Sequence, residues 1–115
     1  MAEEKRFENK VKDYLTSIGA WWYKTFGNAY TRSGCPDILG VYRGRMIALE
    51  IKASNGRPSA LQLREIERIR KAGGYARILY PKDFESLKRD LEEMADVQYK
   101  EAVERGAEGV LPDAR

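Results

Sequence analysis

The first apolar residues of the chain recur at the spacing of a helix. They fall at i, i+4, i+7, i+8 and i+11, and they are Phe7, Val11, Tyr14, Leu15 and Ile18. This spacing places all five on one helical face, and Gly19 is typical of a C-terminal stop. The aromatic-rich run at 20–26 then favours a strand. The glycines and small polar residues at 27–35 indicate a loop.

Two apolar runs follow, at 36–42 and 45–53, and only Arg43 and Gly44 separate them. Two such runs joined by two turn residues predict a β-hairpin. Successive residues of a strand point to opposite faces of the sheet, so the apolar residues of this hairpin divide between its two faces. One face carries Ile38, Ile47, Leu49 and Ile51, and the other carries Leu39, Val41, Met46 and Ala48. We therefore expect both faces of the hairpin to be covered over most of their length.

The rest of the chain predicts a helix, a strand and a further helix. After a loop at 54–58, Ser59 begins a helix whose apolar face is Leu63, Ile66 and Ile69, and the glycine pair at 73–74 ends it. A short strand at 75–81 precedes Asp83, which is expected to cap the third helix. The apolar face of that helix is Leu87, Leu91 and Met94, and the pattern weakens beyond Val97.

The order of elements is therefore α-β-β-β-α-β-α. A helix between the third and fourth strands allows one parallel, right-handed crossover beside the antiparallel hairpin. The sequence thus predicts an α/β fold with a mixed sheet. A chain of 115 residues suits one domain, which we place at 1–97, with a helix extension and a flexible tail at 98–115.

Composition excludes several classes of catalyst. The chain has no His and one Cys, Cys35, so Ser-His-Asp and Cys-His catalysis are excluded, and a structural zinc site is disfavoured. The chemistry of an enzyme with this composition must rest on Asp, Glu and Lys, with or without a hard metal ion. No apolar run is long enough to span a membrane, and residues 1–10 lack an apolar signal core. We expect a cytoplasmic protein. The net charge of +3 permits a nucleic-acid partner without requiring one.

The predicted hairpin brings two carboxylates together. Counting outward from the Arg43–Gly44 turn places Asp37 opposite Glu50, and such partners have Cβ atoms about 4.5 to 5.5 Å apart. Facing carboxylates repel each other, whereas a bound Mg²⁺ or Mn²⁺ would turn this repulsion into chelation. Lys52 lies on the same face, two residues beyond Glu50. Two alternatives stay open: a β-bulge would shift the partner of Glu50, and Glu50 with Lys52 could form a solvated ion pair worth at most about 1 kcal/mol.

These residues also match a known family. "GCPDILG" at 34–40, followed by "EIK" at 50–52, resembles the PD-(D/E)XK nuclease signature. The order helix, three strands, helix, strand resembles the restriction-endonuclease-like α-β-β-β-α-β core of that superfamily, here with an additional C-terminal helix. More closely, the chain resembles the stand-alone VRR-NUC nucleases of bacteriophages and prophages. Further matching segments lie between residues 5 and 85, and they are 7–8, 22–24, 33–34, 56–59, Gln62 and 72–81.

The resemblance implies a metal-dependent endonuclease that hydrolyses DNA phosphodiester bonds. It also implies selectivity for branched DNA, similar to that of Holliday junction resolvases, and a homodimer. Asp37, Glu50 and the carbonyl of Ile51 would hold Mg²⁺ or Mn²⁺, and Glu8 would join or support this metal site. Lys52 would position or deprotonate a water molecule, or neutralise the transition state.

Several of the implied roles have plainer alternatives. Gln62 could point to the active site, or it could form a capping box with Ser59. Glu8 could be one of several exposed helix carboxylates. Three cations, Lys24, Arg32 and Arg57, flank the expected cleft and could contact phosphates or simply be solvated.

Two rival functions stay open from the sequence. One is a non-catalytic nucleic-acid-binding module on a nuclease-like scaffold. The other is an interaction protein that uses Trp21, Trp22 and the C-terminal helix as its interface. For these two tryptophans, packing in the core or at a dimer interface is favoured over stacking on bases.

Overall fold

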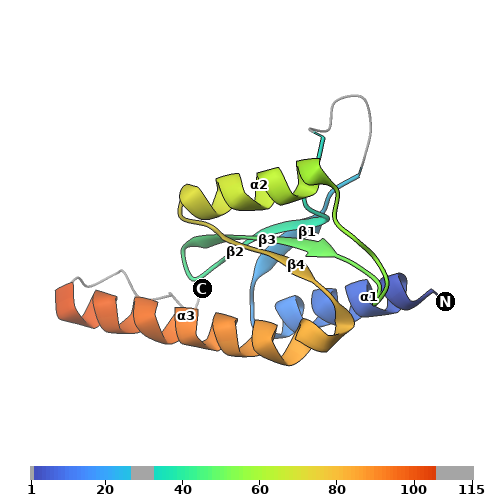
Figure 1. Cartoon of the computed structure of the whole chain (residues 1–115). Coiled ribbons are helices and arrows are strands. Elements are labelled where there is room, and N and C mark those ends of the chain that lie inside the picture. The colour runs from blue at the N-terminus through green and yellow to red at the C-terminus, as the bar shows by residue number, and fades with distance from the viewer. Residues whose placement is uncertain (1, 27–32, 106–115) are drawn as a thin grey trace.

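The structure is a computed structural model that describes residues 2–26 and 33–105 (Figure 1). Its elements follow the predicted order, with one short 3₁₀ turn added at Pro81–Asp83. The helices and strands are α1 (Glu3–Ser17), β1 (Trp21–Lys24), β2 (Ile38–Tyr42), β3 (Arg45–Ile51), α2 (Ala60–Lys71), β4 (Tyr75–Leu79) and α3 (Phe84–Arg105).

The four strands form one mixed sheet in the order β1-β2-β3-β4. The pairs β1–β2 and β2–β3 are antiparallel, and β3–β4 is parallel. A parallel pair requires a crossover connection, and α2 provides it. In Figure 1, α2 covers one face of the sheet, while α1 and α3 cover the other. The predicted fold class is therefore confirmed.

The hairpin turn has the backbone that the sequence predicted. Arg43 has φ 51° and Gly44 has φ 80°, and positive φ at both central residues is the geometry of a two-residue hairpin turn. Tyr42 faces Arg45, and the pairing continues without a bulge to Ile38 opposite Leu49. Asp37 and Glu50 are the next residues on the two sides of the hairpin, one position farther from the turn. The register deduced from the sequence is confirmed.

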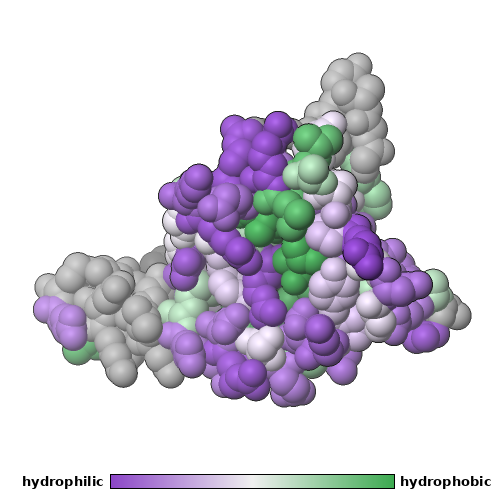
Figure 2. Space-filling model, in the orientation of Figure 1, coloured by the Kyte–Doolittle hydropathy of each residue, from purple (hydrophilic) through white to green (hydrophobic). Residues whose placement is uncertain are grey.

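Two apolar clusters hold the layers together. The larger one, between the sheet and the helices α1 and α3, contains the fully buried face Ile38, Ile47, Leu49 and Ile51. The smaller one, under α2, is built from Ala48, Ile66 and Ala76. At the edge of the sheet between α2 and α3, Figure 2 shows a hydrophobic strip bordered by hydrophilic side chains. The helices thus turn their charged faces to solvent.

The α2 face of the sheet is covered less completely than the sequence predicted. The helix packs mainly against β3 and β4, and Leu39 of β2 packs at the edge of the same cluster. Among the described residues, the rest of this face, on β1, on β2 and at the turn end, is left uncovered. Val41 is 47% exposed and Met46 is 42% exposed. The expectation that both hairpin faces would be buried over most of their length is therefore wrong at the turn end. Alternation along a strand shows which residues share a face, but not how far a helix reaches across it.

The ends of two helices also differ from their apolar patterns. Helix α1 begins at Glu3, whose carboxylate accepts hydrogen bonds from the backbone N–H and the hydroxyl of Ser54, each at 2.7 Å. Asp83 directly precedes α3, and its carboxylate accepts the N–H of Tyr80 at 2.9 Å, which closes the 3₁₀ turn before that helix.

Helix α3 continues through position 97, the predicted domain limit, to Arg105. The division at 97/98 stays a prediction, and the predicted flexible tail, 106–115, lies outside the described residues. Among the helices that are described, none is both long enough and apolar enough to cross a membrane.

Candidate active site

Four of the predicted site residues meet at one end of the sheet. Asp37 lies directly before β2, Glu50 lies near the end of β3, and Lys52 follows β3. The first turn of α2 brings Gln62 to the same place. Glu50 accepts a hydrogen bond from Gln62 Nε2 at 3.0 Å, and Lys52 Nζ lies 3.6 Å from the same carboxylate oxygen. The sheet end and α2 therefore assemble one polar cluster.

Asp37 is held in a defined orientation. Its Oδ2 accepts the backbone N–H of Ile51 at 2.8 Å, and its Oδ1 accepts Lys24 Nζ at 3.2 Å. The loop before Asp37 is seated on α2, because a Cβ on Gly34 would lie 2.5 Å from the carbonyl oxygen of Leu61, and its φ is +80°. Only glycine fits this close approach without strain. Gly34 thus allows the loop before Asp37 to lie directly against α2.

Glu50 is buried beside Asp37 and has an incomplete set of partners. It is 4% exposed. Burial raises its pKa, and the neighbouring charge of Asp37 raises it further, to about 8, against the opposing effect of Lys52. Its Oε2 contacts Gln62 and Lys52, whereas its Oε1 has no hydrogen-bond partner among the described residues. A buried oxygen of this kind costs free energy unless it finds a partner.

The donor set of this pair fits a hard divalent cation. Mg²⁺ and Mn²⁺ prefer carboxylate and carbonyl oxygens, and Asp37 with the unpartnered Oε1 of Glu50 offers such oxygens side by side. A bound cation would satisfy Oε1 and relieve the repulsion that raises the pKa of Glu50. In the described ranges 2–26 and 33–105, however, no three acidic side chains gather into one metal-binding group.

Glu8 is not an exposed helix carboxylate. It is 5% exposed on α1, and it pairs with Lys5 and Lys12 through Oε2 and with Lys24 through Oε1. Burial alone would raise its pKa, but the hydrogen bonds from Lys24, Lys12 and Lys5 outweigh burial and lower it to about 2. Glu8 is thus a permanent anion that reaches Asp37 only through Lys24.

Gln62 fills both of the roles between which its sequence position could not decide. Its Oε1 accepts the N–H of Ser59 at 2.8 Å, and the Ser59 hydroxyl accepts the Gln62 N–H at 3.1 Å. This is a complete capping box. The remaining amide group, Nε2, donates to Glu50 at 3.0 Å. The cap of α2 therefore orients the Glu50 carboxylate.

Of the two predicted phosphate-binding cations that lie in the described residues, Arg57 has the more open position. It lines a hollow of about 760 Å³ together with Ser54, Asn55, Gly56, Pro58, Leu63, Tyr80 and Lys82. Gly56 adjoins Lys52, since a Cβ there would lie 3.4 Å from the Lys52 side chain. The hollow therefore adjoins Lys52, although neither Asp37 nor Glu50 lines it. Arg32 lies outside the described residues, and Lys24 is engaged by carboxylates.

Sequence reasoning missed Lys82 and Tyr80 in this hollow. Parallel strands place their carboxyl ends at the same edge of a sheet, and both β3 and β4 end here. The residues just after "YARIL" at 75–79 should therefore lie near those just after "EI" at 50–51. The predicted parallel crossover thus contained the information that these two segments meet, although no local motif did.

The two tryptophans have different environments. Trp22 packs against the large core cluster and donates its indole N–H to Thr16 Oγ1 at 3.0 Å. Trp21 is 64% exposed beside Tyr23, with ring centroids 5.7 Å apart. Core packing is thus confirmed for Trp22, while Trp21 belongs to the uncovered part of the sheet.

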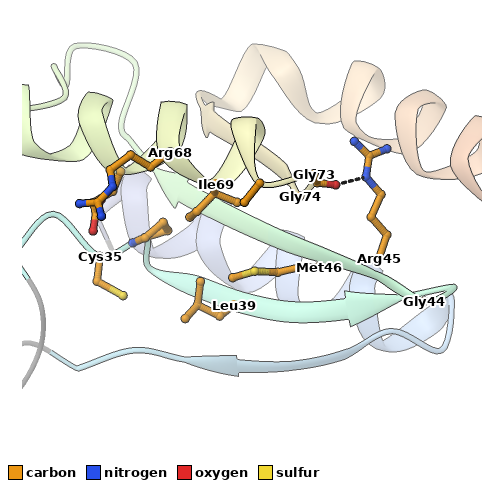
Figure 3. Close-up of a pocket in the computed structure, with 12 residues that line it drawn as sticks. Cys35, Leu39, Gly44, Arg45, Met46, Arg68, Ile69, Gly73 and Gly74 are labelled. Atoms are coloured by element: carbon orange, nitrogen blue, oxygen red, sulfur yellow. Dashed lines mark hydrogen bonds and ion pairs between the residues drawn. The ribbon is translucent and has the colours of Figure 1, made fainter.

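A separate apolar groove of about 670 Å³ lies between α2 and that uncovered part of the sheet. Figure 3 shows Leu39 and Met46 on the strand side and Ile69 on the helix side. At one end, Arg45 Nε donates to the carbonyl oxygen of Gly73 at 3.0 Å. Neither Asp37 nor Glu50 lines this groove, so it is distinct from the acidic pair.

Comparison with solved structures finds a VRR_NUC domain with a TM-score of 0.64 and 29% sequence identity, covering 77% of this chain and 97% of the other. It also finds Hjc of Archaeoglobus fulgidus, described as a Holliday junction resolvase, with a TM-score of 0.51 and 22% identity over 66% of each chain. No protein-family model and no curated protein matches the chain. The chain thus has the fold of a VRR_NUC domain, which confirms the resemblance inferred from its motifs.

Proposed function

We propose that the chain is a metal-dependent endonuclease that hydrolyses phosphodiester bonds of DNA and prefers branched forms. The observation that carries this proposal is the Asp37–Glu50 pair, in which Glu50 is buried and Asp37 is partly exposed. One Glu50 oxygen lacks a partner among the described residues, and Lys52 Nζ lies 3.6 Å from the other. The likeness to a VRR_NUC domain and to a Holliday junction resolvase supports the choice of DNA and of branched substrates.

Asp37 and Glu50, with the carbonyl of Ile51, would hold Mg²⁺ or Mn²⁺. When bound, such an ion generates a nucleophilic water and stabilises charge on the scissile phosphate. Gln62 keeps Glu50 oriented through its 3.0 Å hydrogen bond. The Ile51 N–H keeps Asp37 oriented in the same way, at 2.8 Å. This preorganisation spares the site from reordering its ligands during the reaction.

Lys52 would act on the reacting phosphate. Its side chain is 15% exposed, and its Nζ lies 3.6 Å from the Glu50 carboxylate. An ammonium at this place neutralises negative charge that grows on the phosphate as the bond to the water forms. The hollow with Arg57 and Lys82 would hold the neighbouring phosphates of the same strand, which positions the DNA without reading its sequence.

The test is a cleavage panel of single-stranded, duplex, flap and four-way DNA, with and without Mn²⁺ or Mg²⁺. We expect metal-dependent cleavage that is fastest on a branched form. Cleavage that survives excess EDTA would contradict the metal-dependent mechanism. Salt-sensitive binding without cleavage under any metal would instead favour the non-catalytic binding module. The cytoplasmic location and the phage origin stay predictions from the sequence.

We also propose that the protein is a homodimer, joined through the uncovered sheet face. Four exposed side chains lie on this face, and they are Trp21, Tyr23, Val41 and Met46. Trp21 pairs with Val41, and Tyr23 pairs with Leu39, so these side chains point the same way. Exposed aromatic and methionine side chains of this kind are enriched at protein interfaces. Because β1 is an edge strand, a second copy can approach this face from the open side.

Introducing a charge on this face should dissociate the dimer. Val41→Glu places a carboxylate at the centre of the proposed interface, so we expect light scattering to give the mass of one 13.2 kDa chain. Val103→Glu is the matched control, because Val103 is also exposed, at 56%, but lies on α3. The control should keep the wild-type mass. A wild-type protein that is monomeric at tens of micromolar would overturn the dimer.

A further inference from the structure

One ammonium group lies between two carboxylates of the candidate site. Lys24 Nζ is 2.8 Å from Glu8 Oε1 and 3.2 Å from Asp37 Oδ1. Its side chain is only 23% exposed. Lys24 comes from β1, Glu8 from α1, and Asp37 from the start of β2. Three elements other than α2 therefore converge on this cation.

Neutralising Glu8 does not account for this arrangement. Glu8 already binds Lys5 and Lys12 through its other oxygen, Oε2, each at 2.9 Å. Lys24 is the third cation on the same carboxylate, and it is the one that also contacts Asp37. Its distinctive effect is therefore to occupy the facing oxygens of Glu8 and Asp37 together.

The oxygens that remain favour one bound metal ion. Glu50 presents its unpartnered Oε1 beside Asp37, which provides one place for a divalent cation. A second divalent cation would need Glu8 and Asp37 as shared ligands. Both carboxylates direct an oxygen at Lys24 instead, and a fixed positive charge repels a divalent ion brought to the same point.

We infer that the Lys24 ammonium takes the place of a second metal ion, so that each chain binds a single catalytic cation. This inference rests on the proposed function, since it concerns the same metal site. In this one-metal arrangement, Glu8 holds Lys24 rather than binding the metal directly. It also explains why Glu8, Asp37 and Glu50 do not gather into one acidic group in the described part of the chain. A phosphate contact by Lys24, as predicted from the sequence, would have to compete with both carboxylates.

The test replaces Lys24 by a neutral side chain of similar length and counts bound Mn²⁺. Isothermal titration with MnCl₂, checked by the electron paramagnetic resonance signal of free Mn²⁺, gives the stoichiometry without any cleavage reaction. The wild type is expected to bind one Mn²⁺ per chain, and Lys24→Met is expected to bind two. Circular dichroism establishes that each variant is folded.

Lys12→Met is the matched control. It removes the same charge from the same carboxylate, but Lys12 contacts Oε2 of Glu8 and no oxygen of Asp37. We expect this variant to keep a stoichiometry of one, because Lys24 still occupies the shared place. A general effect of lost positive charge would raise the stoichiometry of both variants equally, and that result would overturn the inference.

Failure of the inference can be told apart from failure of the proposed function. A folded Lys24→Met that binds one Mn²⁺, like the wild type, overturns the inference and leaves the metal-dependent nuclease standing. A wild type that binds two Mn²⁺ per chain also overturns the inference and leaves the metal-dependent nuclease standing. A wild type that binds no Mn²⁺ at all, at any pH up to 9, overturns both.

Discussion

Replacing Glu50 with glutamine is expected to lower the rate of DNA cleavage by at least about 10²-fold and, at the same time, to stabilise the metal-free protein. The loss of activity follows because the variant lacks one of the two carboxylates that would hold the metal, and with it the stabilisation that the metal supplies. The gain in stability follows because the carboxylate is buried beside Asp37 and has an unpartnered oxygen. A neutral amide can donate to Asp37 and accept from Gln62.

The stability difference should depend on pH in a defined direction. The pKa of Glu50 is raised from 4.5 to about 8 in the folded protein, so folding favours the protonated form. The stability that this provides is complete below pH 4.5 and is lost as the pH rises through 8. Glu50→Gln does not titrate at this position. Its advantage in the free energy of unfolding should therefore grow between pH 5 and pH 8, to on the order of 2 kcal/mol.

Urea unfolding in EDTA at several pH values measures this difference. Glu67→Gln is the matched control, since Glu67 lies on α2 with an exposed side chain and a weak contact of 4.0 Å to Lys71. The control should change neither cleavage nor the pH dependence of stability. If Glu50→Gln were destabilising at pH 8, the carboxylate would have to be satisfied in the metal-free protein, contrary to the geometry described above.

Replacing Lys52 with methionine should abolish turnover while the metal is still bound. We expect kcat at saturating Mn²⁺ to fall by about 10² to 10⁴-fold, the range for loss of a group that moves a proton or neutralises charge in the transition state. Asp37 and Glu50 stay in place in this variant. Mn²⁺ should therefore still bind at pH 9, above the pKa of about 8 of Glu50.

Single-turnover cleavage and Mn²⁺ titration separate these two effects. Lys71→Met, which removes an exposed lysine of α2 with only the weak contact to Glu67, should behave like the wild type in both measurements. A Lys52→Met variant with wild-type kcat would show that Lys52 serves only as an ion-pair partner of Glu50. Weaker Mn²⁺ binding with an unchanged kcat at saturating metal would lead to the same conclusion.

The central pair of the site could be predicted from the sequence because it depends on local geometry. A two-residue turn at Arg43 and Gly44 sets the register of the hairpin, and the register places Asp37 opposite Glu50. Alternation along the strand then places Lys52 on the same side. Each step follows from residues fewer than twenty positions apart, and β-strand geometry has a strict period of two.

The other contacts depend on how separate elements pack. The sequence showed Glu8 on a helix and Lys24 on a strand, but the ion pair between them requires α1 to cross the sheet at one position. From the sequence, the capping box with Ser59 and the contact with the active site were alternatives for Gln62. Both form because α2 starts beside Glu50. Likewise, Arg57 and Lys82 share a hollow only because β3 and β4 end at the same edge.

The sequence by itself thus determined the order of elements, the hairpin register and the Asp37–Glu50–Lys52 set. Tertiary structure decided which carboxylate oxygens are occupied and which one is left without a partner. The physical reason is that periodicity and turn geometry act between neighbours in the chain. The distance from Lys24 to Glu8 and Asp37, and the reach of α2 across the sheet, are set by side-chain packing between helices and strands that no local pattern encodes.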